Sequence, residues 1–273
     1  MPQHSREVAF IGAGNMGEAL IQGLVDSGRE PSSLAIADSR PERIDALQQR
    51  FPGLGAGAAE ELAGDSAILV LAVKPQTLPE VAPTLRDAVA SGDPLVVSVA
   101  AGVTTARLGE WLGPQARIVR AMPNTPALVG AGVTGLFAGP GVGEEDRRAA
   151  TALMEAVGRA LWVEDEELMH AVTATSGSGP AYVFLIIEAM QAAAEELGLP
   201  AQTARELTLG TLAGATRLAA NSPEDAAELR RRVTSPGGTT EQALNTLEQG
   251  DLRGLLRRAM QAAAARSEEL GRG

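Results

Sequence analysis

The glycine-rich segment VAFIGAGNMGEALIQGL, residues 8–24, constrains the fold more than any other part of the chain. Gly12, Gly14 and Gly17 form a G-x-G-x-x-G pattern between an apolar run that predicts a strand and a stretch with helical periodicity. In such a unit the first glycine permits a tight turn, the second lets the backbone approach a pyrophosphate, and the third lets helix and strand pack closely. The segment therefore predicts a dinucleotide-binding turn, with an ordinary glycine turn as the alternative.

Apolar runs alternate with helical patterns through the first part of the chain. The predicted strands cover residues 8–11, 34–37, 68–73, 95–99 and 118–122, with weaker candidates near Val133 and before Val163. Continuously apolar runs are typical of strands covered on both faces, and strand–helix alternation indicates a mostly parallel sheet. We therefore expect residues 1–164 to form an α/β Rossmann domain that binds a dinucleotide.

The pattern becomes helical after about Glu164. The predicted helices cover residues 180–197, 200–220, 240–248 and 252–270, and Ser222 is the expected N-cap of a further helix that begins at Pro223. TSGSGPAYVF, residues 175–184, predicts the glycine-rich start of a buried helix. No flexible linker separates the two patterns, so residues 165–273 are expected to form an all-helical domain.

The residue inventory excludes several kinds of chemistry. The 273 residues include no Cys and two His, so we expect no metal site, and a Ser-His-Asp triad is disfavoured. A formal net charge of −11 argues against nucleic acid or anionic lipid as a partner, and no apolar run is long enough for a membrane helix. With the absence of Cys, these features favour a cytoplasmic protein. The chemistry must come from few side chains, a cofactor or both.

The residues after the second predicted strand, ADSRPER, give conflicting signals about the adenosine ribose. Asp38 is placed to bind a ribose 2′-hydroxyl, which favours NAD(H). Ser39 and Arg40 can hold a 2′-phosphate, which favours NADP(H). We expect NADP(H) to be preferred and NAD(H) to be tolerated; a solvated loop charge is the alternative for Arg40.

Lys74, in AVKPQ, is the single lysine of a chain whose other basic residues are all Arg. It follows the third predicted strand, and Pro75 favours an extended conformation at Lys74. Because open parallel sheets bind ligands at the carboxyl ends of their strands, Lys74 is expected beside the cofactor. A compact ammonium fits where a forked guanidinium does not. A chance position of the lysine is the alternative.

The segment RRRVTSPGGTTEQAL, residues 230–244, predicts an anion site in the helical half. One helix ends, SPGG breaks the chain, and a new helix begins near Thr239 or Thr240. The backbone N–H groups of residues 237–240 are therefore expected to be free and to point at one position, which suits a carboxylate. Ser235 and Thr240 add hydroxyl groups. A simple helix cap by Thr239 is the alternative.

These motifs resemble the Δ1-pyrroline-5-carboxylate reductase family. FIGAGNMG, AVKPQ, VVSVAAGVT, RAMPNTPALV, SGSGPAYVF and VTSPGGTTEQAL occur in the family's order and cover nearly the whole chain. The resemblance implies NAD(P)H-dependent reduction of this cyclic imine to L-proline, the last step of proline biosynthesis. It also implies an interleaved dimer formed by the helical domain, ring-like decamers, and a substrate site at the dimer interface.

The resemblance also implies individual roles. The cofactor-binding residues are expected to be Ile11, Gly12, Ala13, Gly14, Asn15, Met16, Ser39, Arg40, Ala72, Val73, Lys74, Pro75, Val99, Ala100 and Ala101. The substrate-binding residues are expected to be Ser235, Gly237, Gly238, Thr239 and Thr240, and the Thr240 hydroxyl is the candidate catalytic contact to the ring nitrogen. The family often has Asn where Ala59 stands and no acid where Asp38 stands, so the cofactor preference stays open.

Two other functions fit parts of the pattern. A β-hydroxyacid dehydrogenase also combines a Rossmann domain with helices, but it uses a catalytic Lys in the helical domain, and this chain has no Lys after residue 74. A non-catalytic dinucleotide-binding regulator that dimerises through its helices is the second alternative. Such a regulator has no need of the SPGGTT anion site.

Overall fold

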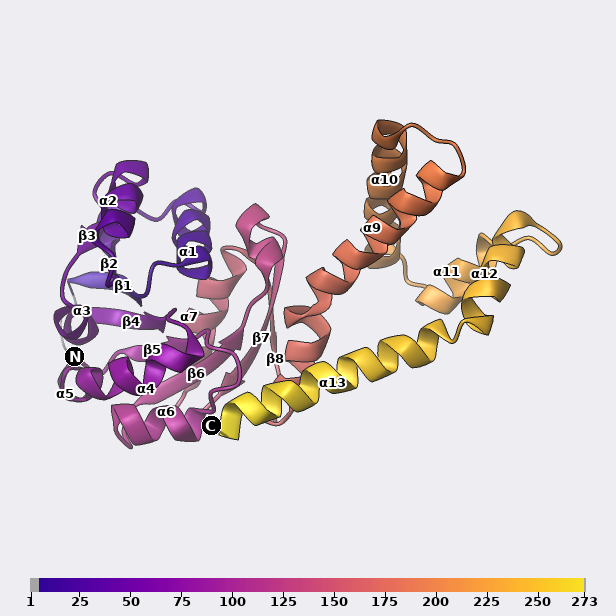
Figure 1. Ribbon diagram of the computed structural model, residues 1–273. Helices are drawn as coiled ribbons and strands as arrows, with labels where there is room; N and C mark the ends of the chain where they lie inside the picture. The colour runs from indigo at the N-terminus through magenta and orange to yellow at the C-terminus, as the bar shows by residue number, and fades with distance from the viewer. Residues whose placement is uncertain (1–4, 273) are drawn as a thin grey trace. The chain divides into compact units, whose positions relative to one another are not determined.

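The computed structural model describes residues 5–272 and divides the chain into two compact units (Figure 1). The first unit extends to Ser178 and includes the residues from Ala262 onward, and the second unit is Gly179–Gln261. The predicted fold class, a Rossmann domain followed by helices, is confirmed. The predicted boundary at residues 164 and 165 lies just after the sheet, whereas the first unit also keeps residues 165–178 and the end of the last helix.

A mostly parallel sheet forms the first unit. Its eight strands are β1 (Arg6–Ile11), β2 (Leu34–Ala37), β3 (Gly55–Ala56), β4 (Ser66–Leu71), β5 (Leu95–Ser98), β6 (Arg117–Met122), β7 (Gly132–Ala138) and β8 (Gly158–Trp162). The strand order is β3-β2-β1-β4-β5-β6-β7-β8, and only the β6–β7 pair is antiparallel. The strand order therefore reverses between β1 and β4: the strands before β4 are added on one side of β1, and β4 and the later strands are added on the other side.

Helices cover the two faces of this sheet (Figure 1). They are α1 (Asn15–Asp26), α2 (Pro41–Arg50), α3 (Ala59–Asp65), α4 (Leu78–Val81), α5 (Arg86–Gly92), α6 (Thr105–Leu112), α7 (Glu144–Glu155) and α8 (Leu168–Val172). Short 3-10 turns are η1 (Pro31–Ser33), η2 (Pro75–Thr77), η3 (Ala82–Leu85) and η4 (Thr125–Val129), and η5 (Thr173–Gly177) is a π-helical turn after α8.

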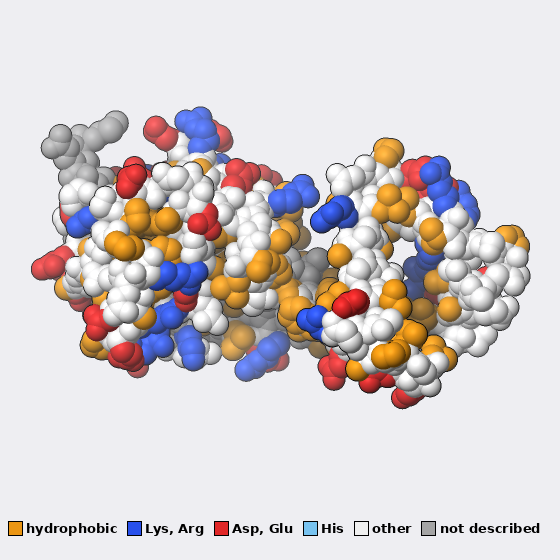
Figure 2. All heavy atoms as spheres, turned by 90° about the horizontal axis from the view of Figure 1, so that it is seen from above, with side chains coloured by type: hydrophobic (Ala, Val, Ile, Leu, Met, Phe, Trp, Pro, Cys, Tyr) orange, Lys and Arg blue, Asp and Glu red, His pale blue; other side chains and the backbone are white. Residues whose placement is uncertain are grey.

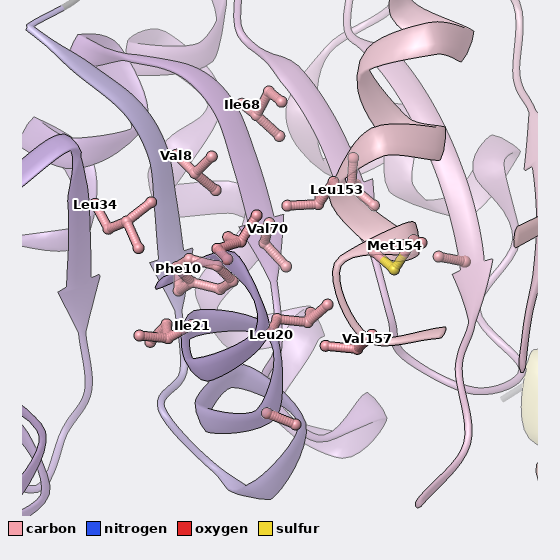
Figure 3. Close-up of a cluster of buried hydrophobic side chains, with 14 of the residues drawn as sticks. Val8, Phe10, Leu20, Ile21, Leu34, Ile68, Val70, Leu153, Met154 and Val157 are labelled. Carbon is pink, nitrogen blue, oxygen red and sulfur yellow. The ribbon is translucent and has the colours of Figure 1, made fainter. Parts of the chain in front are cut away.

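Alternate residues of the central strands enter two separate cores. Phe10 and Val70 belong to one hydrophobic cluster, in which Figure 3 shows them beside Leu20 of α1 and Leu153 of α7. Ile11 and the other strand residues that alternate with those of the first cluster belong to a second cluster on the opposite face. A strand directs successive side chains to opposite faces, so a run that is apolar throughout fits only a sheet covered on both sides.

The second unit consists of helices with the predicted order. They are α9 (Gly179–Glu196), α10 (Ala201–Asn221), α11 (Ala226–Arg232), α12 (Thr239–Gln249) and the first part of α13 (Leu252–Arg272). The expected N-cap role of Ser222 is wrong. Asp225 caps α11 instead, because its carboxylate accepts the N–H of Glu228 at 2.8 Å, while the Ser222 hydroxyl accepts the N–H of Glu224 in the preceding turn at 3.1 Å.

The helical unit leaves many apolar side chains exposed in the single chain. The expectation that α9 is a buried helix is wrong for the single chain. The helix has no buried residue, and Phe184 and Leu185 are 62% and 66% exposed. Figure 2 shows hydrophobic side chains at the surface of this unit. Within residues 5–272, none of the helices combines the length and hydropathy that a membrane span requires.

Candidate functional site

A cleft of about 730 Å³ lies at the carboxyl edge of the sheet. The segments after β1, β2, β4 and β5 contribute its lining: Gly12, Gly14, Asn15, Met16, Asp38, Ser39, Arg40, Ala72, Val73, Lys74, Pro75, Thr77, Val99, Ala100 and Ala101. In open α/β sheets, ligands bind at this edge where the strand order reverses, which here is between β1 and β4. Two of the predicted cofactor residues, Ile11 and Ala13, are buried and do not line this cleft. Thr77 lines the cleft although it was not predicted to bind the cofactor.

The glycine turn combines close packing with open space. A Cβ at Gly12, whose φ is +97°, would lie 2.8 Å from the backbone C and O atoms of Ala72. A Cβ at Gly17 would lie 2.7 Å from the carbonyl oxygen of Gly12, so both positions require glycine. Gly14 differs, because a Cβ there would meet no atom within 4 Å. It is the N-cap of α1 without a side-chain cap, which leaves the helix N-terminus available to an anion.

Asp38 and Arg40 form a hydrogen-bonded ion pair at the part of the cleft that follows β2. The Asp38 carboxylate accepts the N–H of Ala13 at 2.8 Å, and it accepts the guanidinium of Arg40 through Nε at 2.9 Å and Nη2 at 3.1 Å. The Asp38 side chain is 6% exposed and that of Arg40 is 55% exposed. Burial raises the pKa of Asp38, but the hydrogen bonds from Arg40 and Ala13 outweigh burial, so its pKa lies below the ordinary value.

A second, smaller pocket of about 420 Å³ adjoins this end of the cleft. It shares Asp38 and Ser39 with the cleft, and Ile11, Ala58 and Ala59 contribute apolar lining. Ile11, predicted as a cofactor residue, therefore lines this pocket and not the main cleft. The pocket therefore continues the cleft beyond Asp38 and Ser39.

Lys74 lies in the loop beyond β4. The predicted strand reached Val73, whereas β4 ends at Leu71. Lys74 is extended, with φ −62° and ψ 147°, as a residue before proline is expected to be, and its carbonyl accepts the N–H of Thr77 at 2.9 Å. The side chain is exposed at the cleft, and among the described residues it forms no hydrogen bond or ion pair.

The turn between α11 and α12 contains the predicted substrate residues, all within the second unit. Gly237 has φ +71°, and Ser235 is folded over Gly238, because a Cβ at Gly238 would lie 2.5 Å from the Ser235 hydroxyl oxygen. Gly238 is the N-cap of α12 and Thr239 its first residue, so the alternative of a cap by Thr239 is excluded. The Thr240 side chain stands in the first turn of this helix.

The expectation of free N–H groups throughout residues 237–240 is wrong in part. The N–H of Gly237 donates to the Glu241 carboxylate at 2.8 Å, and the N–H of Gly238 donates to the Ser235 carbonyl at 3.0 Å. The tight turn satisfies these two donors internally. The N–H groups of Thr239 and Thr240 form no hydrogen bond within the described residues, and they are the donors available to a carboxylate.

Sequence reasoning missed an ion pair between a buried arginine of β6 and a carboxylate just before α8. Arg120, 2% exposed, contacts the Glu166 carboxylate at 3.2 Å, and Glu166 also accepts the N–H and the hydroxyl of Thr105 at 2.8 Å each. Burial lowers the pKa of Arg120 from its ordinary value, with Glu166 opposing this shift. The contacts anchor Thr105, the first residue of α6, to Glu166. An arginine inside the apolar run of β6 was the available signal.

The comparisons with known proteins agree with this geometry. A family model described as pyrroline-5-carboxylate reductase dimerisation matches residues 166–270, and one described as NADP oxidoreductase coenzyme F420-dependent matches residues 7–102. A pyrroline-5-carboxylate reductase from Pseudomonas aeruginosa is 44% identical over 263 residues, which cover 96% of each chain. The chain belongs to the pyrroline-5-carboxylate reductase family.

Solved structures of this family share the complete fold. The pyrroline-5-carboxylate reductase from Coxiella burnetii has 42% sequence identity and a TM-score of 0.92, covering 98% of this chain and 99% of that chain. The pyrroline carboxylate reductase from Plasmodium falciparum, solved with NADP bound, has 28% identity and a TM-score of 0.87, covering 99% and 100% of the chains. The arrangement of a Rossmann unit followed by a helical unit is therefore the family's arrangement.

Proposed function

We propose that this protein is a pyrroline-5-carboxylate reductase, which reduces the C=N bond of Δ1-pyrroline-5-carboxylate to give L-proline, the last step of proline biosynthesis. The similarity over 96% of both chains to the Pseudomonas aeruginosa reductase carries the proposal. The first unit supports it with a cleft suited to a dinucleotide, and the second with a helix N-terminus suited to a carboxylate. A β-hydroxyacid dehydrogenase is disfavoured, since the helical unit contains no Lys.

The cleft residues fit a nicotinamide dinucleotide. Gly14 offers open backbone for the pyrophosphate, which also meets the uncapped N-terminus of α1. The segments Ala72–Pro75 and Val99–Ala101, at the ends of β4 and β5, form the nicotinamide side. When bound in reduced form, the dinucleotide would supply a hydride to the carbon of the protonated imine, whose C=N electron pair would move to the nitrogen to give the amine. The protein has only to hold the substrate, orient its ring and support the nitrogen.

We assign NADP(H) as the preferred cofactor, with NAD(H) accepted. The exposed guanidinium of Arg40 already neutralises Asp38, so a 2′-phosphate would approach a cation and not a bare carboxylate. Ser39 adds a hydroxyl donor at the same place. Asp38 keeps the Ala13 N–H as a partner when Arg40 turns toward the phosphate. NAD(H) lacks the 2′-phosphate, and its ribose 2′-hydroxyl can donate to Asp38 directly.

We assign the substrate carboxylate to the turn between α11 and α12. The N–H groups of Thr239 and Thr240 stand at the N-terminus of an 11-residue helix, where the helix dipole favours an anion. Ser235, Gly237 and Gly238 shape the turn around this position. The Thr240 hydroxyl is the proposed contact to the ring nitrogen, where it supports the nitrogen as it changes from iminium to amine.

The helical unit supports self-association, as the matching dimerisation family indicates. In the single chain, α9 has no fully buried residue and several of its apolar side chains are exposed, and a second copy of the same helix supplies apolar surface of the same kind. A decamer and a cytoplasmic location stay predictions.

An NAD(P)H oxidation assay with Δ1-pyrroline-5-carboxylate and a panel of β-hydroxyacids tests the proposal. We expect oxidation of the reduced cofactor with the imine and no reduction of the oxidised cofactor with the hydroxyacids. Cofactor binding without any turnover would indicate a regulator. Turnover of a hydroxyacid would indicate a dehydrogenase, and either result would overturn the proposed function.

A further inference from the structure

Asn124, which follows β6, uses its buried side-chain amide to bridge two segments. The residue is 8% exposed. Its Oδ1 accepts the N–H of Val133 in β7 at 2.9 Å, and its Nδ2 donates to the carbonyl oxygen of Ser176 in η5 at 3.0 Å. The first contact ties the segment after β6 to β7, and the second ties the π-helical turn to that segment. These two contacts use the amide as both acceptor and donor.

The Ser176 carbonyl needs this donor because of the local sequence. In a continuing α-helix it would accept the N–H of residue 180, but Pro180 has no N–H. The helix widens at this point, and the N–H of Ser178 reaches back to the Thr173 carbonyl at 2.8 Å, which is the i to i+5 pattern of a π-turn. A partly buried carbonyl that lacks a donor destabilises the turn, so the hydrogen bond from Asn124 stabilises this turn specifically.

The π-turn and the nicotinamide side of the cleft lie at the same edge of the sheet. β5 and β6 are parallel neighbours with Ser98 opposite Arg120, so the residues that follow both strands leave the sheet at the same edge. Val99–Ala101, which follow β5, line the cleft. Met122 ends β6, and a Cβ at Gly177 would lie 2.5 Å from its Cε atom, so η5 packs directly against the end of β6.

We propose that Asn124 is a positioning residue that holds η5 as a wall beside the place where the imine accepts hydride. This inference rests on the proposed function, because that function assigns the nicotinamide to the ends of β4 and β5. A small cyclic imino acid offers few groups to bind, so the surrounding walls must set the angle and distance of its ring. Asn124 touches neither ligand in this assignment and acts only through η5.

The variant Asn124→Asp separates the two contacts of the amide. A carboxylate still accepts the N–H of Val133, but it cannot donate to the Ser176 carbonyl. Gln48→Glu is the matched control, because Gln48 also donates a side-chain amide to a backbone carbonyl, that of Leu54 at 2.9 Å, outside the cleft lining. We expect Asn124→Asp to lower kcat by about 10- to 100-fold, the effect of misplacing reacting groups by roughly 1 Å.

Three further readouts distinguish positioning from a general loss of structure. The Kd for NADPH should change by less than about threefold in Asn124→Asp, because the cofactor contacts are intact. Amide hydrogen exchange of residues 173–178 should accelerate in this variant and not in Gln48→Glu. Asn124→Ser, which removes both contacts without adding charge, should show the same separation of kcat from cofactor affinity.

The outcomes distinguish a failure of this inference from a failure of the proposed function. Wild-type kcat in Asn124→Asp, or unchanged exchange of residues 173–178, would overturn it. Loss of both cofactor binding and the thermal transition in Asn124→Ser would also overturn it, because the residue would then be a determinant of folding. If the wild-type protein does not reduce the imine, the proposed function fails, and the exchange experiment still tests the contact to η5.

Discussion

Replacing Gly14 with Ala tests where the pyrophosphate binds. Gly14 has φ −72° and ψ −171°, a conformation open to any residue, and an added methyl group meets no protein atom within 4 Å. The substitution should therefore leave the folded state intact, and a smaller entropy of the unfolded chain should raise stability by about 0.4–1 kcal/mol. The methyl group would occupy the cleft at the position that the pyrophosphate requires.

The expected loss of affinity follows from this steric conflict. Forcing a methyl group into a close contact costs about 1–3 kcal/mol, which corresponds to a rise of roughly 5- to 150-fold in the Kd for NADPH. NADH should be affected equally, because both cofactors contain the pyrophosphate. Fluorescence titration gives both Kd values, and a thermal melt gives the stability.

Two other glycines serve as references for this experiment. Gly12→Ala adds a left-handed conformation, at about 1–2 kcal/mol, and a clash with the Ala72 backbone, so it should lower the free energy of unfolding by about 2–5 kcal/mol. Gly109→Ala, inside α6 with no atom within 4 Å, should stabilise the protein slightly without changing cofactor binding. A Gly14→Ala variant with wild-type Kd values would refute the assignment of the pyrophosphate to this turn.

Three side chains give further predictions. Arg40→Ala should raise the KM for NADPH by about 10- to 100-fold and the KM for NADH by less than about threefold. Arg253→Ala, which breaks a similar arginine–carboxylate pair with Glu248, should change neither KM. An equal rise for both cofactors would contradict phosphate recognition. Thr240→Ala should lower kcat by about 30- to 1,000-fold, as expected for a lost transition-state hydrogen bond, with an unchanged Kd for NADPH; unchanged steady-state kinetics would exclude this role. Lys74→Arg should lose nearly as much kcat/KM as Lys74→Met, with wild-type thermal melts for both; full activity of the arginine variant would make the single lysine incidental.

The sheet was largely predictable because its signal is local. Strands buried on both faces need continuous apolar runs, and five such runs became β1, β2, β4, β5 and β6. β3 was not predicted, because its two residues, Gly55 and Ala56, carry no periodic pattern. Its pairing with β2 is decided by the turns around it and not by its own side chains.

The cleft was predictable for the same reason, and the contacts behind it were not. Each predicted segment at the cleft follows a strand directly, so its position is fixed by the sheet. The Asn124–Ser176 and Arg120–Glu166 contacts join residues that are far apart in sequence. A single buried amide or guanidinium can have many partners, and only the packed chain selects one. The internal hydrogen bond from Gly237 to Glu241 is local, but it depends on the backbone angles of a turn that sequence patterns do not specify.

Burial within a single chain does not account for the stability of the helical unit. Ordering its backbone costs about 1–2 kcal/mol per residue, and apolar burial must offset this cost. Among residues 179–261, only Ala204, Thr208 and Gly254 are buried, and all of these are small. Helix hydrogen bonds alone do not stabilise such a unit in water, since isolated helices are marginal. Most of the burial that stabilises α9 and α10 must therefore come from other copies of the chain, so the stability of the helical unit should depend on protein concentration.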